Sequence, residues 1–177
     1  MLLSVHFRRE WHHADGRDEV YRILGVVLEE MEEKENAWFC LADRYVDDKV
    51  LAAEISMRVA INRNSGYGAL IWSAGIGFAW KGSIYESIWI TDNDSPPELD
   101  PKVVVDTETR RYHDPSSVVP LSDVQAAVEE FCLQGTGDRP ECVKWVEGDI
   151  DGQRIDRPPM FEPDEVEFPE IDWNIFS

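Results

Sequence analysis

The sequence contains few cysteines and few basic residues, and each shortage excludes a class of protein. The three cysteines, Cys40, Cys132 and Cys142, are an odd number without Cys-x-x-Cys spacing, which is typical of reduced thiols in a cytosolic protein. Against 36 acidic residues stand only 17 Lys and Arg, so the formal net charge is −19. Such a chain is repelled by nucleic acid and anionic membranes and attracted to a basic partner, although the charge can also serve solubility alone.

Long apolar runs are missing too. No segment approaches the length of a transmembrane helix, and His6, Arg8 and Arg9 stand where a secretory signal would have its apolar core. We therefore expect a cytosolic protein that binds no membrane. With 177 residues and 43% hydrophobic content, the chain is long enough to bury a core, and we predict one domain over residues 1–148. Residues 149–177 are rich in carboxylates and proline but keep several aromatic residues, so we expect an acidic tail docked on the domain or on a partner.

Catalytic and cofactor motifs are also absent. The sequence has no G-x-S-x-G, no H-E-x-x-H, no G-x-x-x-x-G-K and no complete G-x-G-x-x-G, so we predict a protein that is not an enzyme and needs no cofactor. His12, His13 and Asp15 could bind a metal. However, adjacent imidazoles in a predicted turn, with no second cluster nearby in sequence, favour surface polar residues, and we predict no metal site.

The densest apolar and aromatic stretch, residues 66–92, is the centre of the predicted sheet. Residues 67–73 and 84–90 are rich in β-branched and aromatic residues, and the glycine-containing segment between them indicates a hairpin. In the first strand Leu70 and Trp72 face one way and Ala69 and Ile71 the other. Further strands are predicted at residues 3–7, 37–42, 51–61, 103–105 and 142–146. Their short connections favour antiparallel pairing.

Two segments have apolar residues at helical spacing. The first begins after Asp15 or Asp18 as the cap and has an apolar stripe at Val20, Ile23, Leu24, Val27, Leu28 and Met31. The second begins at Pro120 or Ser122, ends at Gly135, and has its stripe at Val124, Ala127, Val128, Phe131 and Cys132. The predicted fold class is therefore α+β: a mainly antiparallel sheet of about five or six strands packed with two amphipathic helices, plus an acidic Pro-rich C-terminal tail.

Several blocks of residues are similar to those of a known family. They are Gly66-Tyr-Gly-Ala-Leu-Ile-Trp72, His113-Asp-Pro115-x-Ser117, Glu129-Glu-Phe-Cys132 and Gly135-Thr-Gly-Asp-Arg-Pro-Glu-Cys-Val-Lys-Trp145. Together they resemble the type-one immunity proteins of bacterial polymorphic toxin systems, over nearly the whole chain. The resemblance implies a non-enzymatic antitoxin that binds and neutralises a cognate toxin domain, commonly a nucleic-acid deaminase such as a cytosine deaminase. From the net charge of −19, the acidic cluster at residues 29–35 and the acidic tail, we further expect it to block the toxin's substrate site stoichiometrically. The chain lacks the H-x-E and P-C-x-x-C zinc signature of such deaminases, which suits the inhibitor.

The resemblance brings no catalytic residues, and its blocks indicate fold determinants such as Trp72, Phe131, Pro140 and Trp145. Partner-binding residues are therefore chosen from charge and from exposed aromatic positions. The candidates are Glu29, Glu32, Glu33, Phe78, Trp80, Asp92, Asp94, Asp164, Glu165 and Glu167. The glutamates stand near a helix C-terminus, where the helix dipole disfavours negative charge at a small cost. They are either a solvated face of the helix or kept for a purpose other than stability. For Phe78 and Trp80, burial in the core is the alternative.

Two other classes of protein stay open. A small acidic adaptor would have a uniformly acidic surface and no tight partner. An enzyme with a dispersed site would bring carboxylates together in a deep pocket. Its candidate residues are Asp43, Asp47, Glu54 and Glu86.

Overall fold

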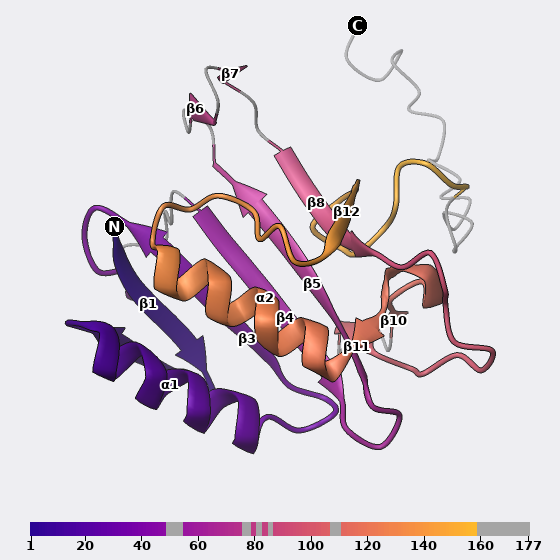
Figure 1. Cartoon of the computed structure of the whole chain (residues 1–177), viewed down its shortest axis with the longest axis horizontal. Coiled ribbons are helices and arrows are strands. Elements are labelled where there is room, and N and C mark those ends of the chain that lie inside the picture. Colours follow the sequence, from indigo (N-terminus) through magenta and orange to yellow (C-terminus); the bar gives the residue numbers. More distant parts are fainter. Residues whose placement is uncertain (49–54, 76–78, 81–82, 85–86, 107–110, 159–177) are drawn as a thin grey trace, which may run out of the picture.

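The protein is an α+β structure in which two helices pack on one face of a broad antiparallel sheet (Figure 1). The computed structural model describes residues 1–48, 55–75, 79–80, 83–84, 87–106 and 111–158. The main sheet has eight strands, and every pairing described in it is antiparallel. In spatial order these strands are β12 (Lys144–Glu147), β8 (Ser87–Asp92), β5 (Tyr67–Ala74), β4 (Ile55–Asn62), β3 (Asn36–Ala42), β1 (Leu2–Phe7) and β2 (Glu10–Ala14), with β11 (Val119–Pro120) paired to β5. The predicted fold class is confirmed.

Outside the main sheet the described residues form two short two-stranded sheets and one short helix. One ladder joins β9 (Val104–Asp106) to β10 (Arg111–Tyr112), and the other joins β6 (Ala79–Trp80) to β7 (Ser83–Ile84). The helix is η1 (Pro115–Ser117), a 3₁₀ turn whose start is capped by Asp114, because its carboxylate accepts a hydrogen bond from the backbone N–H of Ser116 at 2.8 Å. This confirms that residues 113–115 form a turn in which a carboxylate takes a backbone hydrogen bond.

The sheet has more strands than expected. One reason is that the first turn of the chain is short, so that the residues after it form an additional strand. His12 and His13 were predicted in a turn, and this is wrong: both lie in β2, which pairs with β1. The chain reverses at Arg8 and Arg9, whose φ angles are 51° and 66°. Glycine or asparagine usually occupies these left-handed positions, so two arginines there give no sequence signal of a hairpin.

Both helices have the predicted apolar stripes. Helix α1 (Arg17–Glu30) buries Val20, Ile23, Leu24 and Val27, and α2 (Leu121–Gln134) buries Val124, Ala127, Val128, Phe131 and Cys132. Gly135 ends α2 with φ 61°, as predicted. The predicted cap of α1 is wrong, since its N-cap is Gly16 and no side chain caps it. Asp18 lies in the first helical turn instead, where its charge complements the helix dipole.

The main core lies between the helices and the sheet. Leu70 and Trp72 point into this core, while Ala69 belongs to a smaller cluster on the opposite face, which confirms the predicted facing of β5. Trp72 is 1% exposed, and its indole N–H donates a hydrogen bond to the carbonyl of Gly137 at 3.1 Å. In β8, Ile90 pairs with Ile71 of β5, so the two predicted strands of the hairpin are neighbours.

Among the described residues, two groups cover parts of the helix-free face of the sheet. Val103 and Val118 pack on Ala60 and Ala69 at one end of it. Residues 149–158 also lie against the sheet, because Gly148 forms a bridge with Arg154, whose side chain is 4% exposed. The domain boundary predicted at residue 148 stays a prediction. In the described ranges, no helix has the length and apolarity needed to cross a membrane.

Candidate functional site

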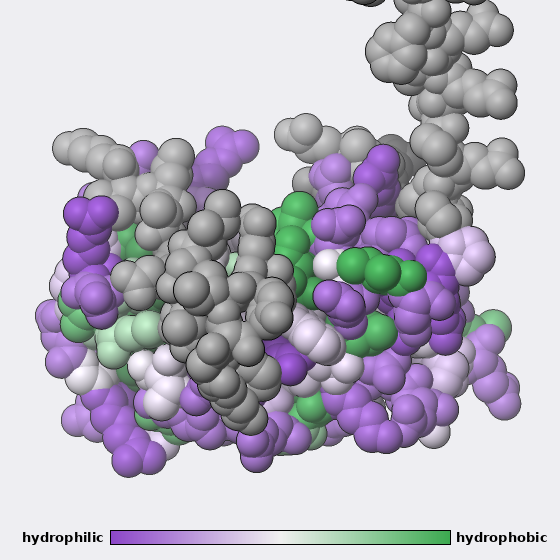
Figure 2. Space-filling model, turned by 90° about the horizontal axis from the view of Figure 1, so that it is seen from above, coloured by the Kyte–Doolittle hydropathy of each residue, from purple (hydrophilic) through white to green (hydrophobic). Residues whose placement is uncertain are grey.

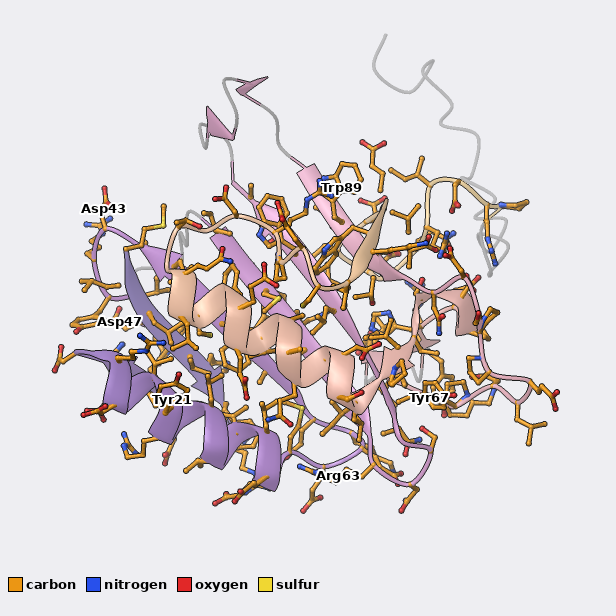
Figure 3. The ribbon with its side chains drawn as sticks, viewed as in Figure 1. Tyr21, Asp43, Asp47, Arg63, Tyr67 and Trp89 are labelled. Atoms are coloured by element: carbon orange, nitrogen blue, oxygen red, sulfur yellow. The ribbon has the colours of Figure 1, made fainter. Side chains whose placement is uncertain are left out.

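Three of the candidate partner-binding residues lie together at the C-terminal end of α1. Glu29, Glu32 and Glu33 line a groove there of about 560 Å³. We call it the α1-end groove; it is lined by Glu29, Glu30, Met31, Glu32, Glu33, Lys34, Arg63 and Asn64. Figure 3 shows Arg63 beside this end of the helix. The first six residues are continuous in sequence, whereas Arg63 and Asn64 come from the turn between β4 and β5.

Arg63 holds the end of α1 in place. Its Nε donates to the carbonyl oxygen of Met31 at 3.1 Å, and its Nη2 donates to the carbonyl oxygen of Leu28. These are among the last carbonyls of the helix, which have no partner within it. A cation at this position also opposes the negative end of the helix dipole. The unfavourable placement of the glutamates is therefore offset by an arginine from another part of the chain.

Arg8 binds the same end of α1 from the opposite side. Its guanidinium lies 2.9 Å from the Glu30 carboxylate, 3.0 Å from that of Glu35 and 3.9 Å from that of Glu32. It also donates to the Glu30 carbonyl at 2.7 Å. Burial of Glu35 raises its pKa, but the hydrogen bonds from Arg8 and from the backbone N–H of Glu32 outweigh this, so that the pKa lies below its ordinary value.

The three candidate glutamates differ in how far their charge is satisfied. Glu33 accepts a hydrogen bond from the Asn64 amide. Glu32 has a side chain that is 78% exposed, and its one ion pair among the described residues, to Arg8, is long at 3.9 Å. Glu29 is exposed and makes no ion pair within the described ranges. Both residues thus present exposed carboxylates to solvent.

Asp92 and Asp94 lie elsewhere, at the end of β8, and both have partners within the chain. Asp94 forms an ion pair with Lys144 of β12. Asp92 accepts from the buried guanidinium of Arg154 at 2.7 Å, and Arg154 also contacts Asp156 at 2.9 Å. These hydrogen bonds and charges raise the pKa of Arg154, with the bond to Asp156 as the largest cause. Asp92 therefore fixes residues 149–158 to the sheet, and its role in partner binding stays a prediction.

The other candidates cannot be placed at the groove. Phe78, Asp164, Glu165 and Glu167 lie outside the described residues. The backbone of Trp80 lies in β6, which pairs with β7 and not with the main sheet. Their roles remain predictions.

The residues of the alternative enzyme site do not form a site in the described ranges. Asp43 is exposed and Asp47 is half-buried, and Figure 3 shows both near the N-terminal end of α1, far along the helix from Arg63. Neither lines the α1-end groove. Glu54 and Glu86 lie outside the described residues. In the portion of the chain that the structure covers, no three His, Cys, Asp or Glu residues are grouped to hold a metal ion.

Sequence reasoning missed Arg63 and Asn64, which complete the groove, and Arg8, which binds the same end of the helix. Arg8 is separated from Glu35 by 27 positions, and Arg63 from Met31 by 32. Both arginines bond partly to main-chain carbonyls, which every residue carries. No local pattern could have identified them, because the contacts exist only once the β1–β2 and β4–β5 turns are brought to the end of α1.

Comparison with known proteins identifies a family. Residues 8–147, more than three quarters of the chain, match the family model described as immunity protein Imm1. The match spans both helices and every strand of the main sheet except β1, which ends at Phe7, one residue before the match begins. No curated protein matches the chain.

Proposed function

We propose that this chain, which belongs to the Imm1 family of immunity proteins, neutralises a basic nucleic-acid deaminase toxin by covering the toxin's substrate site. Family membership makes the chain an immunity protein, and an immunity protein binds a cognate toxin. The deaminase class comes from the family resemblance, and we place the action in the cytosol, which suits the three free thiols. The protein acts as a stoichiometric inhibitor and performs no chemistry on the toxin.

The α1-end groove is the observation that supports this mechanism. Glu29 and Glu32 are exposed carboxylates at the C-terminal end of α1, where Arg63 bonds the Met31 carbonyl and Arg8 forms a long ion pair with Glu32. A nucleic-acid enzyme carries cations where substrate phosphates bind. The groove would occupy that position with carboxylates, so that inhibitor and nucleic acid compete for the same cations.

The overall charge supports fast association. On the face seen in Figure 2, most of the described residues are hydrophilic, and hydrophobic residues lie between them. With a net charge of −19, the chain attracts a basic partner over the distance of a Debye length, about 8 Å at physiological ionic strength. The association rate should therefore fall several-fold as salt rises through the physiological range. An association rate that does not depend on salt contradicts this part of the proposal.

The decisive experiment compares two triple variants with the same change in net charge. The groove variant is Glu29→Gln, Glu32→Gln, Glu33→Gln, in which glutamine can still accept the Asn64 hydrogen bond. The control variant changes three exposed acids away from the groove: Asp43→Asn, Glu98→Gln, Asp149→Asn. Binding to the toxin domain encoded beside this chain, and its deaminase activity on nucleic acid, are measured with each.

Both variants should slow association equally, because steering depends on total charge. Only the groove variant should also dissociate faster, since a carboxylate buried against a toxin arginine can contribute about 2–5 kcal/mol. Equal protection by the two variants would exclude the groove as the contact. Full inhibition at sub-stoichiometric amounts would exclude blocking as the mechanism.

A further inference from the structure

The helix-free face of the sheet carries two neighbouring rows of very different side-chain size. Paired positions across the sheet form a row of large residues: Trp11, His6, Trp38, Arg58, Ile71, Ile90 and Val146. The next row along the strands is small over β1, β3, β4 and β5, at Ser4, Cys40, Ser56 and Ser73, and has His13 and Ile88 at its two ends. Because large side chains stand beside small ones, the face is hollowed between the two rows.

This hollow, which we call the sheet-face hollow, has a volume of about 380 Å³. It is lined by His6, Trp11, Trp38, Cys40, Val46, Asp48 and Ser56. That volume is at the lower end of the range of about 300–1,000 Å³ that is usual for ligand pockets, and it suits a side chain better than a large cofactor. None of its residues lines the α1-end groove.

The polar groups of the floor are already satisfied within the protein. Ser56 Oγ lies 2.7 Å from Ser73 Oγ, and Ser4 Oγ accepts from the backbone N–H of Val46 at 3.0 Å. Cys40 is buried, and its surroundings are apolar. A ligand in the hollow would therefore meet the faces of half-buried indole rings and few free hydrogen-bonding groups.

One charged group stands at the hollow, and its position is fixed. The Trp11 indole N–H donates to Asp48 Oδ1 at 2.8 Å, and the Asp48 side chain is exposed. Trp11 is itself held by the His6 ring, 4.9 Å away between centroids. Asp48 Oδ2 makes no hydrogen bond within the described ranges. The hollow thus combines aromatic faces with a carboxylate oriented beside them.

This combination has the chemistry of a site for a planar cation. A guanidinium is attracted to the face of an indole ring and can also donate to a carboxylate, which an apolar group cannot. An apolar occupant would remove water from Asp48 without replacing its hydrogen bonds. Trp38 already stacks with a guanidinium of this chain, because the Arg58 Cζ lies 5.2 Å from its ring centroid.

We propose that the sheet-face hollow binds an arginine side chain of the toxin, with the guanidinium stacked on Trp11 and Trp38 and paired with Asp48. The proposal rests on the proposed function for the source of the arginine, and the net charge of −19 favours a basic occupant. It gives the inhibitor a second contact, on the sheet face, that is independent of the α1-end groove. An arginine anchored between aromatic side chains is typical of the residues that dominate binding energy at interfaces.

The first test needs no toxin. The peptide acetyl-Gly-Arg-Gly-amide is titrated into the full chain while NMR follows the indole N–H signals of Trp11 and Trp38, assigned from Trp→Phe variants. The matched peptide carries citrulline, which has nearly the shape of arginine but no charge. We expect saturable shifts of both signals with the arginine peptide, with a dissociation constant in the millimolar range, and none with citrulline. Equal shifts with citrulline, or no shift with either peptide, would overturn the proposal.

The second test uses Asp48→Asn, which keeps the acceptor for the Trp11 hydrogen bond but removes the charge. Its control is Asp43→Asn, which removes the same charge from an exposed residue of the same segment outside the hollow. Asp48→Asn should weaken binding of the arginine peptide and of the toxin about tenfold with an unchanged melting temperature, and Asp43→Asn by less than about twofold. Equal affinity of the two variants for the toxin would overturn the sheet-face contact. The proposed function is judged separately, by the groove variant.

Discussion

Arg63 Nε lies 3.1 Å from the carbonyl oxygen of Met31, so that a residue of the β4–β5 turn closes the C-terminal end of α1. The same guanidinium also bonds the Leu28 carbonyl. This relationship explains how a helix can end in consecutive glutamates. The cation that the helix lacks in its own last turn is supplied by a turn that follows two strands later. Arg63 therefore stabilises this end of the helix, while the glutamates make the groove acidic.

Replacing Arg63 should accordingly destabilise the protein. In Arg63→Met two carbonyls lose their donor and the glutamates lose a nearby cation, and we expect a cost of about 1 kcal/mol in the free energy of unfolding, measured by urea denaturation. The cost should increase at low salt, where the glutamates repel each other more strongly. The control is Arg22→Met, whose exposed ion pair with Glu19 on the same helix should matter less. Equal effects of the two substitutions would show that Arg63 does not close the helix.

Arg154 should contribute more to the free energy of unfolding than Arg63 does, because its side chain is buried. Its guanidinium contacts Asp92, Asp156 and the Ser116 carbonyl, at 2.7, 2.9 and 3.2 Å. Arg154→Met removes the buried cation that pairs with Asp92, and we expect a loss of about 3 kcal/mol in the free energy of unfolding together with faster hydrogen exchange in residues 149–158. Arg157→Met is the control, since Arg157 is exposed and its ion pair with Asp114 is 3.4 Å long. A change of less than about 1 kcal/mol in Arg154→Met would show that this pair does not hold the segment.

The elements that were predicted correctly are those that a pattern within one segment of the sequence indicates. The stripe of α2 and the strand 37–42 follow from the spacing of apolar residues alone, and the structure has both. The β2 strand was missed because Arg8 and Arg9 take left-handed conformations without the usual turn residues. Of the candidate site, only the acidic residues that stand close together in the sequence were predicted. Glu29, Glu32 and Glu33 are adjacent in sequence and could be grouped, whereas Asp92 was grouped with them although its partner Arg154, 62 positions away, gives it a structural contact.

Substitutions in the core test how the helices pack on the sheet. Phe131 of α2 and Trp72 of β5 are each 1% exposed and belong to the same cluster. Phe131→Ala or Trp72→Ala should cost about 3–5 kcal/mol in the free energy of unfolding, because each leaves a cavity that the close-packed surroundings fill only in part. Val26→Ala on the exposed side of α1 should change it by less than about 0.5 kcal/mol. A core variant that melts like the wild type would contradict the packing described.

His113 should make the protein less stable in mild acid. It is 2% exposed, its Nδ1 has no hydrogen-bond partner in the part of the chain that the structure describes, and its backbone N–H donates to the Val103 carbonyl. Burial, and next the positive charge of Arg58, lower the pKa of His113 from 6.5 to about 3. Between these two values the unfolded chain holds a proton on this side chain that the folded chain does not, so acid favours unfolding. The contribution of neutral His113 to the free energy of unfolding is complete above about pH 6.5 and is lost as the pH falls toward the pKa of His113 in the folded chain.

This pH dependence can be isolated with two replacements that do not titrate, His113→Gln and His113→Leu. Between about pH 7.5 and pH 5 the wild type should lose about 2 kcal/mol of unfolding free energy more than either variant. The carboxylates titrate in all three proteins, so their contribution cancels in the difference. Glutamine and leucine will differ in absolute stability because they pack differently, but their pH slopes should agree. If the wild type and both variants had parallel pH profiles in urea denaturation, His113 would have to take up its proton equally in the folded and unfolded chain, contrary to its burial beside Arg58.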